Sequence, residues 1–142
     1  MTAYAYYPGC SLSGLGKPYD ESLRAVFGHL GLGLEEIPDW NCCGATSYMS
    51  VSEDKAVALA ARNLALAEQM DAEIVAPCAA CYLVLTKAQH KMSEYPALAA
   101  KVRHGLQMAG LTYDGHVAVR HPLDILVNDV GLDAIRRVSY TR

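Results

Sequence analysis

The cysteines constrain this chain more than any other feature, because each of them lies beside glycine or proline or at the start of a helix. There are five: Cys10, the adjacent pair Cys42 and Cys43, and Cys78 with Cys81. Neighbouring side chains normally point in different directions, so an adjacent pair reaches one centre only where the backbone turns sharply. Gly44 follows the pair and permits such a turn at low steric cost. The sequence therefore predicts that thiols distant along the chain meet at one site.

Short β-prone runs precede three of these cysteine groups. We predict strands over residues 3–7, 34–37, 74–76 and 117–119, each bounded by glycine, proline or polar residues. Helical spacing of apolar residues, with proline at first turns, predicts helices over residues 19–30, 53–70, 78–92, 96–108 and 122–129. A last short helical piece is expected after Gly131. Strands and helices thus alternate through most of the chain.

This alternation favours an α/β fold, an open parallel sheet of about four strands flanked by helices. In such sheets ligands collect beyond the carboxyl ends of the strands. Cys10, the Cys42–Cys43 pair and Cys78 each follow a different predicted strand. We therefore expect three cysteine loops to converge at the C-terminal edge of the sheet.

Length and charge narrow the classes of function. With 142 residues, the chain suits a single domain, 1–142, with a linker beginning near 136–142. A net charge of −3 without a Lys/Arg stripe argues against a nucleic-acid-binding surface. We expect a cytoplasmic protein, because no basic leader precedes the first strand and no apolar run reaches the ~18 residues of a membrane span. In the cytoplasm such cysteines are typical of metal binding or catalysis rather than of disulfides.

Four roles for the cysteines are compatible with their positions. Inert packing is disfavoured, because the thiols are expected in loops and not on apolar helix faces. A redox dithiol suits Cys78 and Cys81 at a helix start but leaves the other three unexplained. Tetrahedral zinc takes four thiolates and would leave one spare. Thiolates also hold iron–sulfur clusters, and a fifth ligand would indicate an unusual cluster that does chemistry.

The cysteines and their surroundings resemble the cysteine-rich CCG domain of the B subunit of heterodisulfide reductase. The likeness covers nearly the whole chain and is carried by five segments: Tyr7-Pro8-Gly9-Cys10-Ser11, Asp39-Trp40-Asn41-Cys42-Cys43-Gly44-Ala45, Ala61-Arg62-Asn63-Leu64-Ala65, Ala76-Pro77-Cys78-Ala79-Ala80-Cys81-Tyr82 and Val119-Arg120-His121-Pro122-Leu123. That family carries two CCG motifs, and this chain carries one. It resembles the N-terminal half of such a protein.

The resemblance implies a cofactor and its ligands. A non-cubane [4Fe-4S] cluster would be held by Cys10, Cys42, Cys43, Cys78 and Cys81, with zinc as the alternative metal. Preparation in air is expected to remove the cluster. The parent protein would be a CoB–CoM heterodisulfide reductase-like oxidoreductase, whereas a lone half would hold its cluster but lack half of the active site.

The resemblance also implies partners. They are a second CCG domain, an iron–sulfur electron-transfer protein resembling the C or A subunit of heterodisulfide reductase, and a disulfide substrate. Related CCG domains occur in lactate, glycolate and succinate oxidoreductase complexes, which gives an alternative assignment. A zinc-binding structural or interaction domain is the other alternative.

Other residues near the cysteines receive subsidiary predictions. Trp40 is expected to pack over the cluster, and Asn41 and Ser11 are candidate hydrogen-bond donors to cluster sulfurs. His121 follows the last strand at the same sheet edge. We favour a role for it as the cap of the next helix over a direct role at the site.

Overall fold

The computed structural model describes residues 2–139 and contains one sheet of four parallel strands. Their spatial order is β2-β1-β3-β4, with β1 at Thr2–Tyr6, β2 at Leu32–Glu36, β3 at Ile74–Val75 and β4 at Val119–Arg120. The predicted α/β class and open parallel sheet are therefore confirmed.

Strand β1 lies inside the sheet and pairs on both sides. It pairs with β2 from Thr2 opposite Leu32 to Tyr6 opposite Glu36. On its other side it pairs with the short β3, where Tyr6 lies opposite Val75. Interior parallel strands are covered on both faces, and three consecutive residues, Tyr4, Ala5 and Tyr6, are accordingly buried.

The two faces of the sheet support two separate cores. Tyr4, Tyr6 and Val75 point to one face and pack with Leu23 and Phe27 of α2 (Lys17–His29). The alternate residues Ala5, Tyr7, Ile74 and Ala76 point to the other face. There they join the core formed by three helices: α4 (Glu53–Glu68), α5 (Ala79–Glu94) and α6 (Pro96–Met108).

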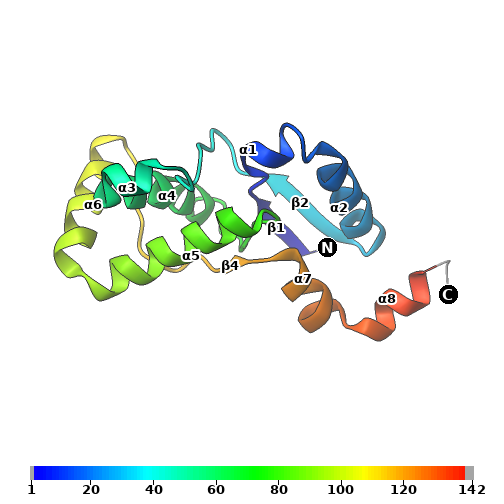
Figure 1. The fold of residues 1–142 in the computed structure, drawn as a ribbon. Helices are drawn as coiled ribbons and strands as arrows, with labels where there is room; N and C mark the ends of the chain where they lie inside the picture. The colour runs from blue at the N-terminus through cyan, green and yellow to red at the C-terminus, as the bar shows by residue number, and fades with distance from the viewer. Residues whose placement is uncertain (1, 140–142) are drawn as a thin grey trace.

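Figure 1 shows the three helices α4, α5 and α6 grouped at one end of the molecule and α2 with β2 at the other. Helix α4 presents a buried stripe of small residues: Ala56, Ala60, Ala61, Ala65 and Ala67. Small side chains allow the helix to approach its neighbours closely. None of the helices within residues 2–139 is long and apolar enough to cross a membrane.

Several short elements differ from the prediction. Helix α1 (Gly9–Leu12) and helix α3 (Tyr48–Val51) occupy segments expected to be loops. The helix predicted over 122–129 is a single turn, α7 (Pro122–Asp124), followed by a π-helix, η1 (Ile125–Val130). Helix α8 (Leu132–Val138) includes the start of the predicted linker, whose residues 140–142 lie outside the described residues.

Candidate metal centre

The structure places all five cysteines just beyond the C-terminal ends of strands. Cys10 lies in α1 after β1, the Cys42–Cys43 pair lies in the loop after β2, and Cys78 is the N-cap of α5 after β3, with Cys81 in the first turn of that helix. The predicted convergence at this edge of the sheet is confirmed. It follows from topology, because neighbouring parallel strands all end on the same side.

The thiols form an inner and an outer layer. Cys43 and Cys81 are each 3% exposed, and their Sγ atoms are 3.3 Å apart. Cys78 is half-buried, whereas Cys10 and Cys42 are exposed. The arrangement therefore has a protected inner pair and an outer side that is open to solvent.

Two glycines allow the backbone to approach the thiols. Gly9 has φ +70°, and a Cβ there would lie 2.9 Å from Cys81 Sγ, closer than side-chain carbons approach other atoms. Gly44 has φ +90°, and its N–H points at Cys42 Sγ at 3.4 Å. Both positions require the left-handed conformation that glycine adopts readily. The sharp turn predicted after the cysteine pair is thus present.

Tyr7 is fully buried among the thiols. Its hydroxyl donates a 2.6 Å hydrogen bond to the backbone oxygen of Asn41, next to the cysteine pair. Burial raises the pKa of Tyr7 well above its usual range, and the nearby thiols raise it further: Cys43, Cys81, Cys42 and Cys10. Four of the five cysteines are therefore close enough to one buried phenol to act on its charge.

The inner pair shares one negative charge. The hydrogen bond between Cys81 and Cys43 lowers the pKa of Cys43 to about 6, with help from the backbone N–H of Ala45. The same hydrogen bond, together with burial, raises the pKa of Cys81. The hydrogen bond between the two sulfurs therefore favours a single negative charge on the pair, and the pKa of Cys43 is the lower of the two. A thiolate is the form of cysteine that binds metal ions.

Cys78 is held by hydrogen bonds at the start of α5. Burial opposes its ionisation, but hydrogen bonds from the Ser11 hydroxyl and from the N–H groups of Ala80 and Cys81 lower its pKa overall. Donation by Ser11 to a cluster sulfur stays a prediction, and in the structure its hydroxyl faces the sulfur of Cys78. Asn41 behaves differently, because its side-chain amide donates to the backbone oxygens of Cys42 and Leu59 and not to a sulfur.

Trp40 packs beside the site against Tyr7, with ring centroids 5.4 Å apart and planes at 72°. Its indole N–H donates to Glu36 at the end of β2. Tyr7 lies among the thiols, and Trp40 packs against the Tyr7 ring in an edge-to-face contact. Two aromatic rings thus build the apolar surroundings of the inner thiols on this side.

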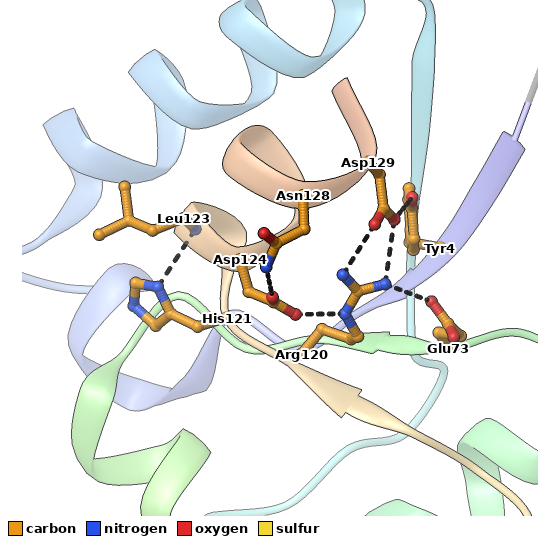
Figure 2. Close-up of polar contacts among 8 residues, drawn as sticks. All are labelled: Tyr4, Glu73, Arg120, His121, Leu123, Asp124, Asn128 and Asp129. Carbon is orange, nitrogen blue, oxygen red and sulfur yellow. Dashed lines mark hydrogen bonds and ion pairs between the residues drawn. The ribbon is translucent and has the colours of Figure 1, made fainter. Parts of the chain in front are cut away.

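His121 caps a helix, as predicted. Its Nδ1 accepts the N–H of Leu123 at 3.2 Å, which leaves the ring proton on Nε2, 3.2 Å from the backbone oxygen of Pro77. Figure 2 shows the bond to Leu123 at the start of α7. Because Pro77 precedes Cys78, this one side chain links the last strand to a cysteine loop.

A cavity of about 610 Å³ lies between α4 and α6, away from the thiols. Its lining includes Leu59, Arg62, Val102 and Leu106, and no cysteine. Arg62 connects it to the site, because its guanidinium donates to the side chain of Asn41 at 3.1 Å. The apolar cavity is therefore a feature separate from the cysteine edge.

The chemistry of the donor set fits a metal centre. Five thiols at one edge are soft ligands, which suit iron–sulfur clusters and zinc. The close approach of Gly9 to Cys81 and the lowered pKa of Cys43 agree with such a site. Within residues 2–139, no three Cys, His, Asp or Glu side chains already stand as a group that can hold one metal ion. The fit thus lies in the chemistry of the thiols and in their placement at one edge, and not in a ligating geometry that is already formed within these residues.

The sequence-based prediction missed Tyr7 and Asn63 as parts of the site. Asn63 is fully buried in α4, and both ends of its amide bind the backbone of Asn41. A signal for it exists in the sequence, since one asparagine interrupts an otherwise apolar helical stripe. Tyr7 carries no comparable signal, because tyrosine is ordinary in a buried strand.

Comparison with known proteins relates the chain to reductase subunits. Residues 4–86 match the family model CCG, described as a cysteine-rich domain. A protein of Archaeoglobus profundus, named as similar to the B subunit of heterodisulfide reductase, is 34% identical over 99% of this chain and 48% of the relative. An 8-methylmenaquinol:fumarate reductase membrane anchor subunit of Wolinella succinogenes is 33% identical over 89% of this chain and 44% of the relative.

A third relative is the B subunit of a ferredoxin/F420H2-dependent CoB-CoM heterodisulfide reductase of Methanosarcina acetivorans, 27% identical over 96% of this chain and 46% of the relative. A hypothetical protein from Helicobacter pylori shares the fold, with a TM-score of 0.78 and 16% identity over 88% of this chain and 25% of the other. The chain spans about half the length of the curated relatives it matches. The match over residues 4–86 shows that the chain belongs to the CCG family of cysteine-rich domains.

Proposed function

We propose that the chain is an iron–sulfur oxidoreductase domain of a protein similar to the B subunit of heterodisulfide reductase. Its five cysteines would hold a non-cubane [4Fe-4S] cluster, with Cys10, Cys42, Cys43, Cys78 and Cys81 as ligands. The observation that supports the proposal is that all five cysteines follow strand ends at one edge of the sheet, with the sulfurs of Cys43 and Cys81 3.3 Å apart, in a family whose relatives are reductase subunits. When bound, the cluster would supply one-electron transfer to a disulfide.

The layering of the thiols gives the residues distinct tasks. Cys43 and Cys81 lie deepest and would anchor the group away from solvent, while Ser11 orients Cys78. Cys10 and Cys42 are exposed, so a substrate sulfur would approach from their side. Tyr7, which packs against Trp40, would keep water from the inner pair where its buried ring lies.

The proposal includes partners. Because the chain spans about half of its curated relatives, a second CCG domain is expected to complete the active site. Electrons would come from an iron–sulfur protein resembling the C or A subunit of heterodisulfide reductase, and the substrate would be a disulfide. We propose a cytoplasmic location for this assembly, with the chain as the N-terminal half of its polypeptide.

Anaerobic reconstitution tests the proposal. The protein is incubated with iron and sulfide, desalted, and analysed for iron, sulfide and zinc and by paramagnetic resonance. About four irons per chain, with a paramagnetic signal that changes when a thiol is added, would support the proposal. One zinc per chain and no signal would sink it and favour a structural zinc domain.

A second assignment has an observation of its own. The Wolinella succinogenes relative is a subunit of a fumarate reductase, which favours a CCG domain of a lactate, glycolate or succinate oxidoreductase complex. The same metal site would then pass electrons in a complex whose substrate is not a disulfide. Oxidation by a small disulfide of the reduced, reconstituted protein combined with its second CCG domain separates the two, because only the first assignment predicts that oxidation.

A further inference from the structure

Asn63 stands apart from the rest of the core. Among residues 3–139, whose side chains are described, it is the one polar residue that is buried, and its exposed fraction is 0%. It lies in α4 next to the buried residue Leu64, in the stripe that faces the core. A buried amide is costly unless its donors and acceptor are hydrogen-bonded, so its partners indicate why it is there.

Both ends of the Asn63 amide bind the backbone of one residue. Its Oδ1 accepts the N–H of Asn41 at 2.9 Å, and its Nδ2 donates to the carbonyl oxygen of Asn41 at 2.9 Å. This is the pair of bonds that a neighbouring strand would supply in a sheet. Residues 40–45 have no regular secondary structure, so no ladder of backbone bonds holds them.

Other side chains bind the same residue. Tyr7 donates its hydroxyl to the carbonyl oxygen of Asn41 at 2.6 Å, and Arg62 donates to the Asn41 side chain at 3.1 Å. The Asn41 amide in turn donates to the backbone oxygen of Cys42 at 2.8 Å. The peptide that leads into the cysteine pair is thus fixed from the residue after β1, from α4 and from its own side chain.

We propose that Asn63 is a positioning residue for the cysteine pair. By fixing the backbone of Asn41, the Asn63 side chain determines the position of the adjacent residues Cys42 and Cys43 and keeps Cys43 beside Cys81. The inference rests on the proposed function for what the cysteines hold. The claim that Asn63 positions the two thiols does not depend on what they bind, so it can be tested on the metal-free protein.

The test compares two equally buried thiols in the reduced, metal-free protein. Cys43 and Cys81 are each 3% exposed, but only Cys43 lies in the loop that Asn63 holds. Asn63→Asp keeps the size of the side chain and replaces the donor to the Asn41 carbonyl with a repelling oxygen. Iodoacetamide labelling read by mass spectrometry should then show the ratio of Cys43 to Cys81 modification rising about tenfold.

Gln89→Glu is the matched control. It makes the same amide-to-carboxylate change at a side chain of α5 that donates to a backbone oxygen, that of Val117 at 2.6 Å, two helical turns away from Cys81. This variant should leave the ratio as in the wild type. An Asn63→Asp protein that folds with an unchanged ratio would overturn the proposal, because general loosening exposes both thiols alike.

Tyr7→Phe gives a second, milder variant if Asn63→Asp does not fold. It removes only the hydroxyl bond to Asn41 and keeps the ring that packs on Trp40. A raised Cys43 to Cys81 ratio supports the fixed-peptide account, and an unchanged ratio overturns it. If the wild type binds no iron, the proposed function fails, while the labelling ratio still decides the role of Asn63.

Discussion

At the scale of single residues, close contacts between backbone and sulfur define the cysteine edge. Gly9 brings the chain against Cys81 Sγ, and Gly44 turns it after the pair so that its N–H faces Cys42. These contacts leave no room for larger residues at Gly9. The Cys43–Cys81 pair lies in the interior beside these contacts, and the pKa values of buried thiols respond strongly to neighbouring groups.

Substitution of Gly9 by alanine should damage the site. The new Cβ would lie 2.9 Å from Cys81 Sγ at φ +70°, a conformation that costs an alanine roughly 1–2 kcal/mol before the clash is counted. We expect a lower melting temperature and reduced iron uptake. Gly28→Ala is the control, since nothing lies within 4 Å of its Cβ in α2. The Gly28→Ala variant should be neutral or slightly stabilising. An equal fall in melting temperature and iron uptake in both variants would show that the contact between Gly9 and Cys81 is not the cause.

The metal-free protein should titrate one thiolate at low pH. The pKa of Cys43, about 6, lies below its unfolded value, so its stabilising contribution is present above that unfolded value and is lost as pH falls through about 6. Cys81 has the opposite sign, because its pKa is raised. Thiolate absorbance should appear near pH 6 and vanish in Cys43→Ser.

Cys81→Ala isolates the cause of this low pKa. Without its hydrogen-bond partner Cys81, the pKa of Cys43 should move up toward the ordinary range of thiols, about 8.5. The measurement is again the pH dependence of thiolate absorbance. A titration that stays near pH 6 in this variant would show that the hydrogen bond between the two sulfurs is not its cause.

The sequence was sufficient to group the five cysteines but not to find their neighbours, for a physical reason. Loops that follow parallel strands meet at one edge whatever their residues are, so the cysteines could be grouped from strand order alone. Gly9 against Cys81 and Asn63 against Asn41 are contacts between segments distant in sequence. They depend on the depth at which α4 and α5 pack, which residue patterns do not specify.

At the scale of elements, Arg120 joins β4 to the C-terminal helices. Its guanidinium binds Asp124 and Asp129, and it reaches Glu73, just before β3, at 3.2 Å. Tyr4 of β1 donates to Asp129 at 3.4 Å. Figure 2 shows the guanidinium at the centre of this network. The C-terminal elements are thereby tied to β1 and to the strand that leads to the cysteines of α5.

Arg120→Ala should loosen this attachment. The variant loses three carboxylate partners at a side chain that is 19% exposed, so we expect the melting temperature to fall by several degrees and amide exchange to rise in α7 and η1. Arg136→Ala is the control, because the side chains of its pair with Asp133 are 76% and 85% exposed. Exposed pairs contribute little. Equal changes in melting temperature and amide exchange in the two variants would show that the Arg120 network does not hold the C-terminal helices.

The long elements were predictable and the short ones were not. Helices α4, α5 and α6 follow from apolar spacing and from residues such as Pro96, whose effects are local. Helices α1 and α3 have only four residues each. Segments of that length gain little from their own hydrogen bonds and form where the surrounding fold places them.

At the scale of the whole molecule, the sheet brings three loops together and leaves their outer side open. The two cores cover both faces of β1, while Cys10 and Cys42 remain exposed at the thiol edge. The chain spans about half of its curated relatives, two of which are named as subunits of reductases. The exposed Cys10 and Cys42 leave this edge accessible to the further CCG domain that we propose.

A multi-iron cluster held by all five cysteines at this edge is the central proposal for the molecule. Crystals of the anaerobically reconstituted protein, measured at the iron absorption edge, test it most directly. We predict anomalous peaks for several irons in one group, reached by Cys10, Cys42, Cys43, Cys78 and Cys81. A single peak at the zinc edge, or iron bound without Cys10 and Cys42, would contradict the account.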